Sequence, residues 1–172
     1  MSRDKDENIR IFVANVLGEI RVWDDVVGEI LNRLSRDRIG SVRLCAVYAL
    51  REIGVWNKDV AGMLKRLSKD PDPDRPVRES VLRSLKKIKI DENTRRRLIR
   101  NIEITNEIVK AARGYFRKLD YEKGMLVIDG LFRNRFDRKK FLKNEKYRKE
   151  LLNLVKAMSV EKLREFVFGK RK

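Results

Sequence analysis

Histidine and glutamine are absent from the 172 residues, and cysteine occurs once, as Cys45. Without histidine, the chain cannot form Ser-His-Asp or Cys-His nucleophile systems, histidine-containing zinc sites or a histidine proton shuttle. A single cysteine excludes an intramolecular disulfide and fits a reducing cytoplasm, where we expect the protein to act. No pair of carboxylates has a spacing that indicates acid–base chemistry, so the sequence leans away from an enzyme and predicts no cofactor and no metal.

Long apolar runs are missing as well. No apolar stretch approaches the 18 residues of a membrane span, and the first ten residues are too polar for a secretory signal, so we expect no membrane partner. The absence of Gln and His, together with abundant Lys, Arg, Glu and Ile, is compatible with a protein of a thermophile.

Positive charge is what the chain has in excess. There are 43 Lys and Arg against 26 Asp and Glu, a formal net charge of +17. Residues 1–70 carry 13 basic and 11 acidic side chains, whereas residues 71–172 carry 30 basic and 15 acidic ones. A surplus of this size favours a polyanionic partner over a neutral small molecule, and it lies in the C-terminal part.

A segment of 30 residues recurs without a gap at an offset of 33. Residues 8–37 and 41–70 are identical at 12 of 30 positions, and Arg10 matches Arg43. A third copy follows at an offset of 35, with Arg78 at the same position, and its two extra residues fall in a proline-rich turn. Repetition on this scale indicates a repeat protein.

Each copy has the pattern of two helices. In the second copy, apolar residues at helical spacing predict a helix over about 41–53, capped by Ser41 and ended by Gly54. A second helix follows Asn57 or Asp59 as its cap, and Asp24 and Asp91 are the expected caps of the corresponding helices in the first and third copies. The first helix of each copy is apolar over more than one stripe, so it must be covered on several sides by stacked neighbours. The sequence therefore predicts an all-α solenoid.

The repeat resembles the HEAT-repeat family, in particular the short variety of phycobilin lyases. Its pattern is a small residue or Pro, then Val-Arg, then alternating Ala and Leu up to Leu-x-x-Ile, and it stands here at residues 41–53 and 76–88. The resemblance covers about residues 6–102 and implies a right-handed α-α superhelix with a C-terminal helical extension. Iron-binding enzymes of this class use His-Glu pairs, an activity that a chain without histidine does not share.

The domain prediction divides the chain at residue 102. Residues 1–102 are expected to hold three repeats, at about 6–37, 39–70 and 74–102, and the basic region 103–172 is expected to pack on them. In that region, helical spacing predicts a long helix over 104–119 and a short one over 125–136, interrupted by Gly130. Further helices are predicted after the caps Asp137 and Ser159.

Two groups of cations are the candidate binding sites for nucleic acid. The repeat cluster comprises Lys86, Lys87, Lys89, Arg95, Arg96, Arg97 and Arg100. The C-terminal cluster comprises Arg133, Arg135, Arg138, Lys139 and Lys140. Either group can bind phosphates with salt-dependent affinity or form a solvated face. Among the cations of the second group, Phe136, Phe141 and Tyr147 could stack on bases, although such aromatic residues more often belong to the core.

Stacked repeats would place Arg10, Arg43 and Arg78 in a row. Such a row could read a phosphate backbone, but we favour a structural role in which each arginine pairs with a neighbouring acid or loop carbonyl. The available partners are Asp37, Asp70 and Asp74.

The first helix of the first repeat is as apolar as the internal one, although terminal repeats normally have a polar outer face. We therefore expect Phe12 and Val16 to be exposed in a monomer. The N-terminal repeat then packs on a second copy, giving a homodimer, or the chain is cut from a longer solenoid.

Three functions remain open at this stage. The first is a non-catalytic scaffold that binds nucleic acid through residues 75–150, and the second is an adaptor for an acidic protein partner. The third and least favoured is a HEAT-like DNA glycosylase for alkylated bases, because only the general architecture matches and three repeats are fewer than that fold uses.

Overall fold

The computed structural model describes residues 6–73 and 76–169, and in these ranges the chain is all-α. Ten α-helices and one short 3₁₀ helix are present, with no strand in the described ranges. None of these helices is long and apolar enough to cross a membrane. The chain forms two compact units, unit 1 (Met1–Ile102) and unit 2 (Glu103–Lys172).

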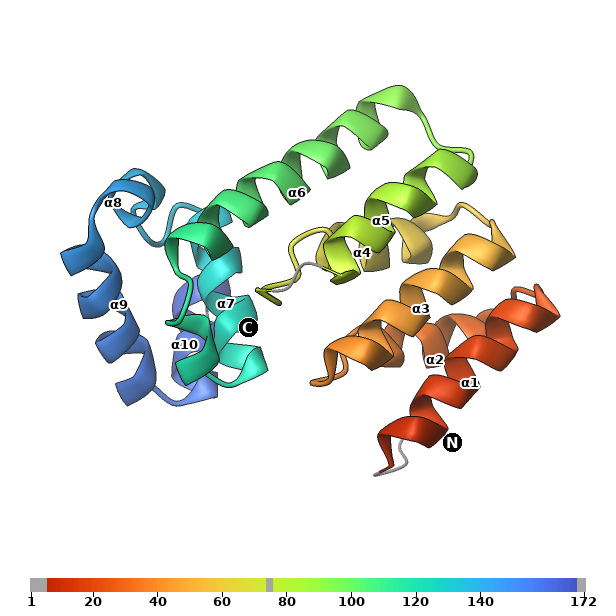
Figure 1. The fold of residues 1–172 in the computed structure, drawn as a ribbon, viewed down its shortest axis with the longest axis horizontal. Coiled ribbons are helices and arrows are strands. Elements are labelled where there is room, and N and C mark those ends of the chain that lie inside the picture. The colour runs from red at the N-terminus through yellow and green to blue at the C-terminus, as the bar shows by residue number, and fades with distance from the viewer. Residues whose placement is uncertain (1–5, 74–75, 170–172) are drawn as a thin grey trace. The chain divides into compact units, whose positions relative to one another are not determined.

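Unit 1 is built from helix pairs, as the repeat predicted (Figure 1). The first pair is α1 (Glu7–Ile20) and α2 (Asp25–Leu34), and the second is α3 (Gly40–Ile53) and α4 (Lys58–Leu67). The third pair starts with α5 (Pro76–Lys87) and continues with α6 (Glu92–Ala111). Helices α1, α3 and α5 lie side by side in one layer, with α2 and α4 in a second layer. The predicted all-α solenoid is confirmed.

Side-chain caps start the second helix of each pair. Asp24 and Asn57 occupy equivalent positions and accept hydrogen bonds from the backbone N–H groups of Val27 (2.7 Å) and Val60 (2.9 Å). Asp91 accepts a corresponding bond at the start of α6. These caps satisfy backbone donors that the helix itself leaves open. All three were predicted from the sequence.

The predicted cap of α3 was wrong. Its N-cap is Ile39, which makes no side-chain cap bond, and Ser41 lies exposed in the first turn. The Asp37 carboxylate accepts a hydrogen bond from the Ile39 backbone N–H (2.9 Å) and so fixes the chain just before the helix. The predicted end of α3 at Gly54 is confirmed by its left-handed φ of 72°.

The core of unit 1 runs through the three pairs. Helices α1 and α3 come close together at Gly18, where a Cβ atom would lie 3.1 Å from the Ala49 Cα. Trp23 and Trp56 pack against this core at equivalent positions of the repeat. Its fully buried side chains include Leu31, Leu34, Val42, Leu50, Met63, Leu64, Leu67, Leu85 and Leu98.

The repeat arginines are buried and bonded to carboxylates or loop carbonyls, and they do not form a phosphate-binding row. Arg43 is 2% exposed, and its Nε and Nη2 donate to the two Asp70 carboxylate oxygens at 2.5 and 3.0 Å. Arg10 donates in the same way to Asp37, at 2.7 Å from Nε. Arg78, with no exposed surface, donates to the backbone carbonyl of Asp70. The predicted structural role is confirmed, and Asp74 lies outside the described residues.

Helix α6 differs from the prediction. It runs without a break from Glu92 to Ala111, so the separate helix expected over 104–119 does not exist. No Pro or Gly occurs between Ile88 and Gly114 to end it. Gly114, with φ of 86°, then follows the helix, and a 3₁₀ turn replaces the rest of the predicted segment.

The described part of unit 2 contains the 3₁₀ helix η1 (Phe116–Lys118) and four further α-helices. These are α7 (Tyr121–Phe132), α8 (Arg138–Lys143), α9 (Glu145–Ala157) and α10 (Val160–Phe168). Asn144 ends α8 and caps α9, so the helix predicted after Asp137 is two helices. The predicted caps Asp137 and Ser159 are confirmed. The packing of residues 103–172 on the solenoid stays a prediction.

Gly130 does not interrupt α7 as predicted. It is buried inside the helix, where the Phe136 ring lies against it, and a Cβ atom there would come within 2.5 Å of two ring atoms. Glycine is needed at this position for the close approach of the ring. The core around it includes Leu126, Ile128, Leu131, Phe141, Leu151, Val155, Leu163 and Val167.

Candidate nucleic-acid interface

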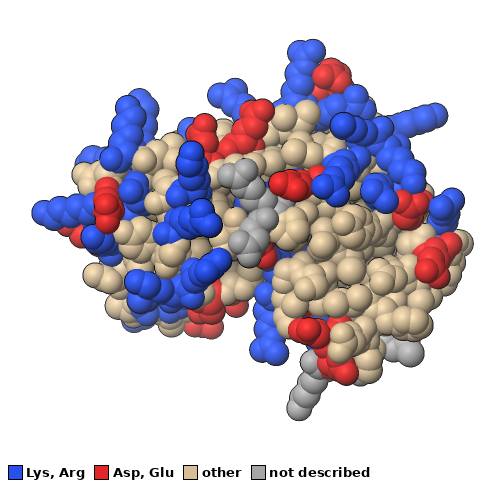
Figure 2. All heavy atoms as spheres, in the orientation of Figure 1, with Lys and Arg blue, Asp and Glu red and all other residues tan. Residues whose placement is uncertain are grey.

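The repeat cluster lies at the end of α5, in the following turn and on the first half of α6, all within unit 1. Its side chains are exposed except for the half-buried Arg95. Figure 2 shows Lys and Arg side chains gathered over this part of unit 1, whereas few charged side chains cover the visible face of α1 and α3.

Acidic neighbours neutralise part of the repeat cluster. Arg95 and Arg96 both pair with Glu92, at 3.3 and 3.1 Å. The Lys87 ammonium lies 2.8 Å from Glu52. The remaining cations make no ion pair with a described residue, and they are Lys86, Lys89, Arg97 and Arg100.

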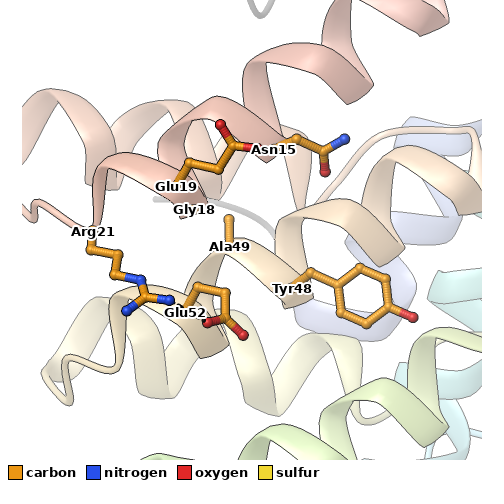
Figure 3. A pocket seen from close by; sticks show the side chains of 7 residues that line it. All are labelled: Asn15, Gly18, Glu19, Arg21, Tyr48, Ala49 and Glu52. Atoms are coloured by element: carbon orange, nitrogen blue, oxygen red, sulfur yellow. Dashed lines mark hydrogen bonds and ion pairs between the residues drawn. The ribbon is translucent and has the colours of Figure 1, made fainter.

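The Glu52 carboxylate lies at an open pocket of about 510 Å³ beside α1 and α3, and it forms ion pairs with several cations (Figure 3). It pairs with Lys87, with Arg51 at 3.0 Å and with Arg21 at 3.3 Å. The hydrogen bonds from Lys87 and then Arg51 hold the pKa of Glu52 below its usual value. The pocket wall is formed by Asn15, Gly18, Glu19, Arg21, Tyr48, Ala49 and Glu52. Because two carboxylates line it, the pocket is unsuited to phosphate, and Lys87 is best assigned to this network.

The C-terminal cluster lies in unit 2, on the turn after α7 and on α8. Arg138 is half-buried and the other four cations are exposed. None of the five makes an ion pair with a described residue. The Arg133 guanidinium lies over the Phe168 ring, 4.5 Å from its centroid, which leaves its charge in place.

Asp137 is the only acid between residues 133 and 143. Its carboxylate is occupied as the N-cap of α8, where it accepts a hydrogen bond from the Lys140 backbone N–H at 2.9 Å. Lys143, which follows this cluster in the sequence, is a sixth cation, and it is exposed and without an ion pair in the described chain. Of the two predicted cation clusters, the C-terminal cluster is therefore the one whose charges are least neutralised by acidic residues of the described chain.

The aromatic residues near this cluster serve the core. Phe136 and Phe141 are 6% and 3% exposed, and Phe136 stacks on Phe166 with ring centroids 5.3 Å apart. Tyr147 is half-buried, and its hydroxyl accepts a hydrogen bond from the Asp137 backbone N–H at 3.0 Å. Neither buried phenylalanine ring is accessible to a base, so the base-stacking hypothesis is wrong for both.

Three cations that follow α8 interact with other residues of unit 2. Lys149 pairs with Glu145 at 2.9 Å, and this bond lowers the pKa of the Glu145 carboxyl. Lys146 approaches Glu150 at 4.0 Å, and the Arg148 guanidinium donates to the backbone carbonyl of Phe141 at 2.8 Å. The four-residue spacing of these acids and bases is visible in the sequence and could have separated them from the exposed cations of α8.

Metal chemistry finds no support in the described ranges, where no group of three Cys, Asp or Glu side chains is placed to hold an ion. A family model for HEAT repeats matches residues 1–86, which extend from the N-terminus into the last turn of α5. No curated protein and no solved structure matches the chain.

Proposed function

The chain belongs to the HEAT-repeat family, a class of repeat scaffolds and interaction modules, and from this premise we propose a non-catalytic scaffold that binds nucleic acid. The proposal rests on one contrast between two groups of cations. The repeat arginines Arg10 and Arg43 are buried on carboxylates, whereas five cations of residues 133–143 are exposed without an ion pair in the described chain. Exposed cations that no acid neutralises are available to a polyanion.

The phosphate backbone is the expected contact. Each phosphate that a Lys or Arg neutralises releases a condensed counterion, so affinity falls steeply as salt rises. Because Phe136 and Phe141 are buried, the C-terminal cluster offers charge without these rings as stacking platforms. We therefore propose binding with little sequence preference, in which Arg133, Arg135, Lys139 and Lys140 contact phosphates and the exposed cations of the repeat cluster add to the attraction.

The same cations support an adaptor for an acidic protein as the second candidate. A nucleic acid presents regularly spaced phosphates, whereas an acidic protein presents carboxylates in a fixed arrangement. The two candidates therefore differ in whether a disordered acidic polymer without phosphate competes with nucleic acid for these cations.

Fluorescence anisotropy with labelled duplex DNA, single-stranded DNA and RNA of equal length tests the proposal, with polyglutamate as competitor. We expect micromolar or tighter binding at low salt and little difference between scrambled sequences, as for contacts made to the backbone. Polyglutamate should compete poorly. Absence of binding to all three nucleic acids at low salt, or displacement by equimolar polyglutamate, would contradict the proposal.

A further inference from the structure

Exposed apolar side chains concentrate at the N-terminal end of unit 1. Phe12 is 66% exposed, Val26 65% and Ile20 57%, and Val22 and Ile9 are also exposed. Val16, one turn from Phe12 on the same face of α1, is half-buried. Apolar side chains gathered on one surface in this way indicate an interface.

The repeat identifies this surface as a stacking face. At an offset of 33, the α1 residues Ile9, Phe12, Val16 and Ile20 correspond to Val42, Cys45, Ala49 and Ile53 of α3. The α3 residues belong to the core of unit 1, where Ala49 touches α1. In α1 the same face is left uncovered by the described chain, and Phe12 is bulkier than its counterpart Cys45.

The opposite end of the helix layer is polar. On α1, the side toward α3 carries Ile11, Asn15 and Gly18. The equivalent residues of α5 are charged and exposed, and they are Glu79, Arg83 and Lys86. Glu79 and Arg83 form an ion pair along the helix. A second copy stacked head to tail would cover these charges with apolar residues, which costs free energy. The apolar face fits another apolar face better.

We propose that α1 packs antiparallel on α1 of a second copy, about a twofold axis, to form a dimer. An axis level with Ala14 sets Phe12 against the partner's Val16 and Ile9 against the partner's Ile20. The apolar face thus meets its own copy, as a twofold interface requires.

The exposed area suits a modest dimer. The five exposed side chains offer roughly 80–100 Å² each, or on the order of 400–500 Å² of apolar surface per chain. A standard interface buries about 800 Å² per partner, of which somewhat more than half is apolar. The stripe therefore supplies the apolar core, and Asn8 and Glu19 beside it are available as the polar rim.

Sedimentation equilibrium of the full chain between about 1 and 100 μM tests the dimer. We expect a mass of twice 20.4 kDa. Phe12→Asp should raise the dimer dissociation constant about tenfold or more, as loss of a central apolar contact does. Leu154→Asp is the matched control, because Leu154 is 54% exposed but lies on α9. Circular dichroism confirms that each variant folds.

Paired substitutions test the antiparallel arrangement. Ile9→Glu and Ile20→Lys should each weaken the dimer, and the double variant should recover part of it, because each introduced carboxylate then meets an introduced ammonium group of the partner. A monomer at 100 μM, a ladder of larger species, or a dimer that Leu154→Asp disrupts and Phe12→Asp does not, would each overturn the proposal. These measurements contain no nucleic acid, so their outcome is independent of the proposed function.

Discussion

A charged side chain in the core costs free energy unless a partner and hydrogen bonds compensate it. In unit 1 the Arg43 guanidinium is compensated by Asp70 and by the backbone carbonyls of Asp37 and Arg38 at 3.0 and 3.1 Å. The arginine therefore ties together the start of α3, the turn before it and the end of the second repeat. It is fixed to the fold and is not available to a ligand.

Asp70→Ala should destabilise the protein by about 3 kcal/mol or more, because Arg43 is then left buried with only the more distant carboxylate of Asp72, 3.7 Å away. Arg83→Ala removes an exposed arginine with an ion pair at the helical spacing and should change the free energy of unfolding by less than about 0.5 kcal/mol. Urea unfolding followed by circular dichroism measures both. Equal effects for the two variants would show that the buried pair is not a structural element.

Two glycines inside helices give opposite predictions. Gly130→Ala places a methyl group against the Phe136 ring and should destabilise by about 1–3 kcal/mol through overpacking. Gly62, exposed inside α4, has nothing within 4 Å of a built Cβ atom. Gly62→Ala should therefore stabilise by about 0.5–1 kcal/mol through helix propensity. Thermal unfolding of the two variants checks the signs, and stabilisation by Gly130→Ala would contradict the packing described.

Residue types predicted local chemistry well where one residue decides it. Asp24, Asn57 and Asp91 were recognisable as caps because a side-chain acceptor stands before an apolar helical stripe. The start of α3 was missed because Asp37 supports it indirectly, through the backbone of Ile39. The role of Gly130 was missed because its neighbour Phe136 reaches it only through the turn that follows α7.

At the level of helices, the Glu52 network ties the first layer of unit 1 together. Glu52 on α3 receives Lys87 from α5 and Arg21 from the segment after α1. The equivalent residue on α1, Glu19, is exposed and makes no ion pair with a described residue. A comparison of substitutions at Glu52 and Glu19 therefore distinguishes a carboxylate that links helices from one that lies exposed on the surface.

Glu52→Gln should lower the melting temperature at pH 7 more than Glu19→Gln does. Because folding lowers the pKa of Glu52, its contribution is present above the unfolded pKa, near 4.5, and is lost as the pH falls through the folded value. The difference in melting temperature between wild type and Glu52→Gln should therefore shrink as the pH is lowered from 7 to values below 4.5. A difference that stays constant over this range would contradict the network.

The repeat period predicted the helix pairs because equivalent residues recur at a fixed offset and bury equivalent faces. The repeat period did not predict the helix boundaries beyond the repeats. The length of α6 was missed because the fading of the repeat after Ile102 was taken as the end of a helix, although no Gly or Pro stands there. A change in sequence pattern marks a change of packing partners and need not break the backbone hydrogen-bond ladder.

For the whole chain, composition predicted a polyanionic partner but not which cations are available to it. Unit 1 carries 23 basic and 16 acidic side chains and unit 2 carries 20 and 10. Within the repeat cluster, Lys87, Arg95 and Arg96 have acidic neighbours, which the sequence shows only for the pairs along α6. Lys87 and Glu52 are 35 residues apart, so only the fold reveals that they meet.

The salt dependence of DNA binding tests the central claim most directly. We compare wild type with a C-terminal variant, Arg133→Gln, Arg135→Gln, Lys139→Gln and Lys140→Gln, and with a control of equal charge, Arg36→Gln, Arg38→Gln, Lys58→Gln and Lys65→Gln. The control cations are exposed and lack ion pairs in the described chain. Plots of log K against log salt should lose about 0.9 in slope for each phosphate contact removed from the C-terminal cluster. The account predicts a slope lower by about 2–4 for the C-terminal variant and by less than about 1 for the control. Equal slopes for the two variants would contradict it.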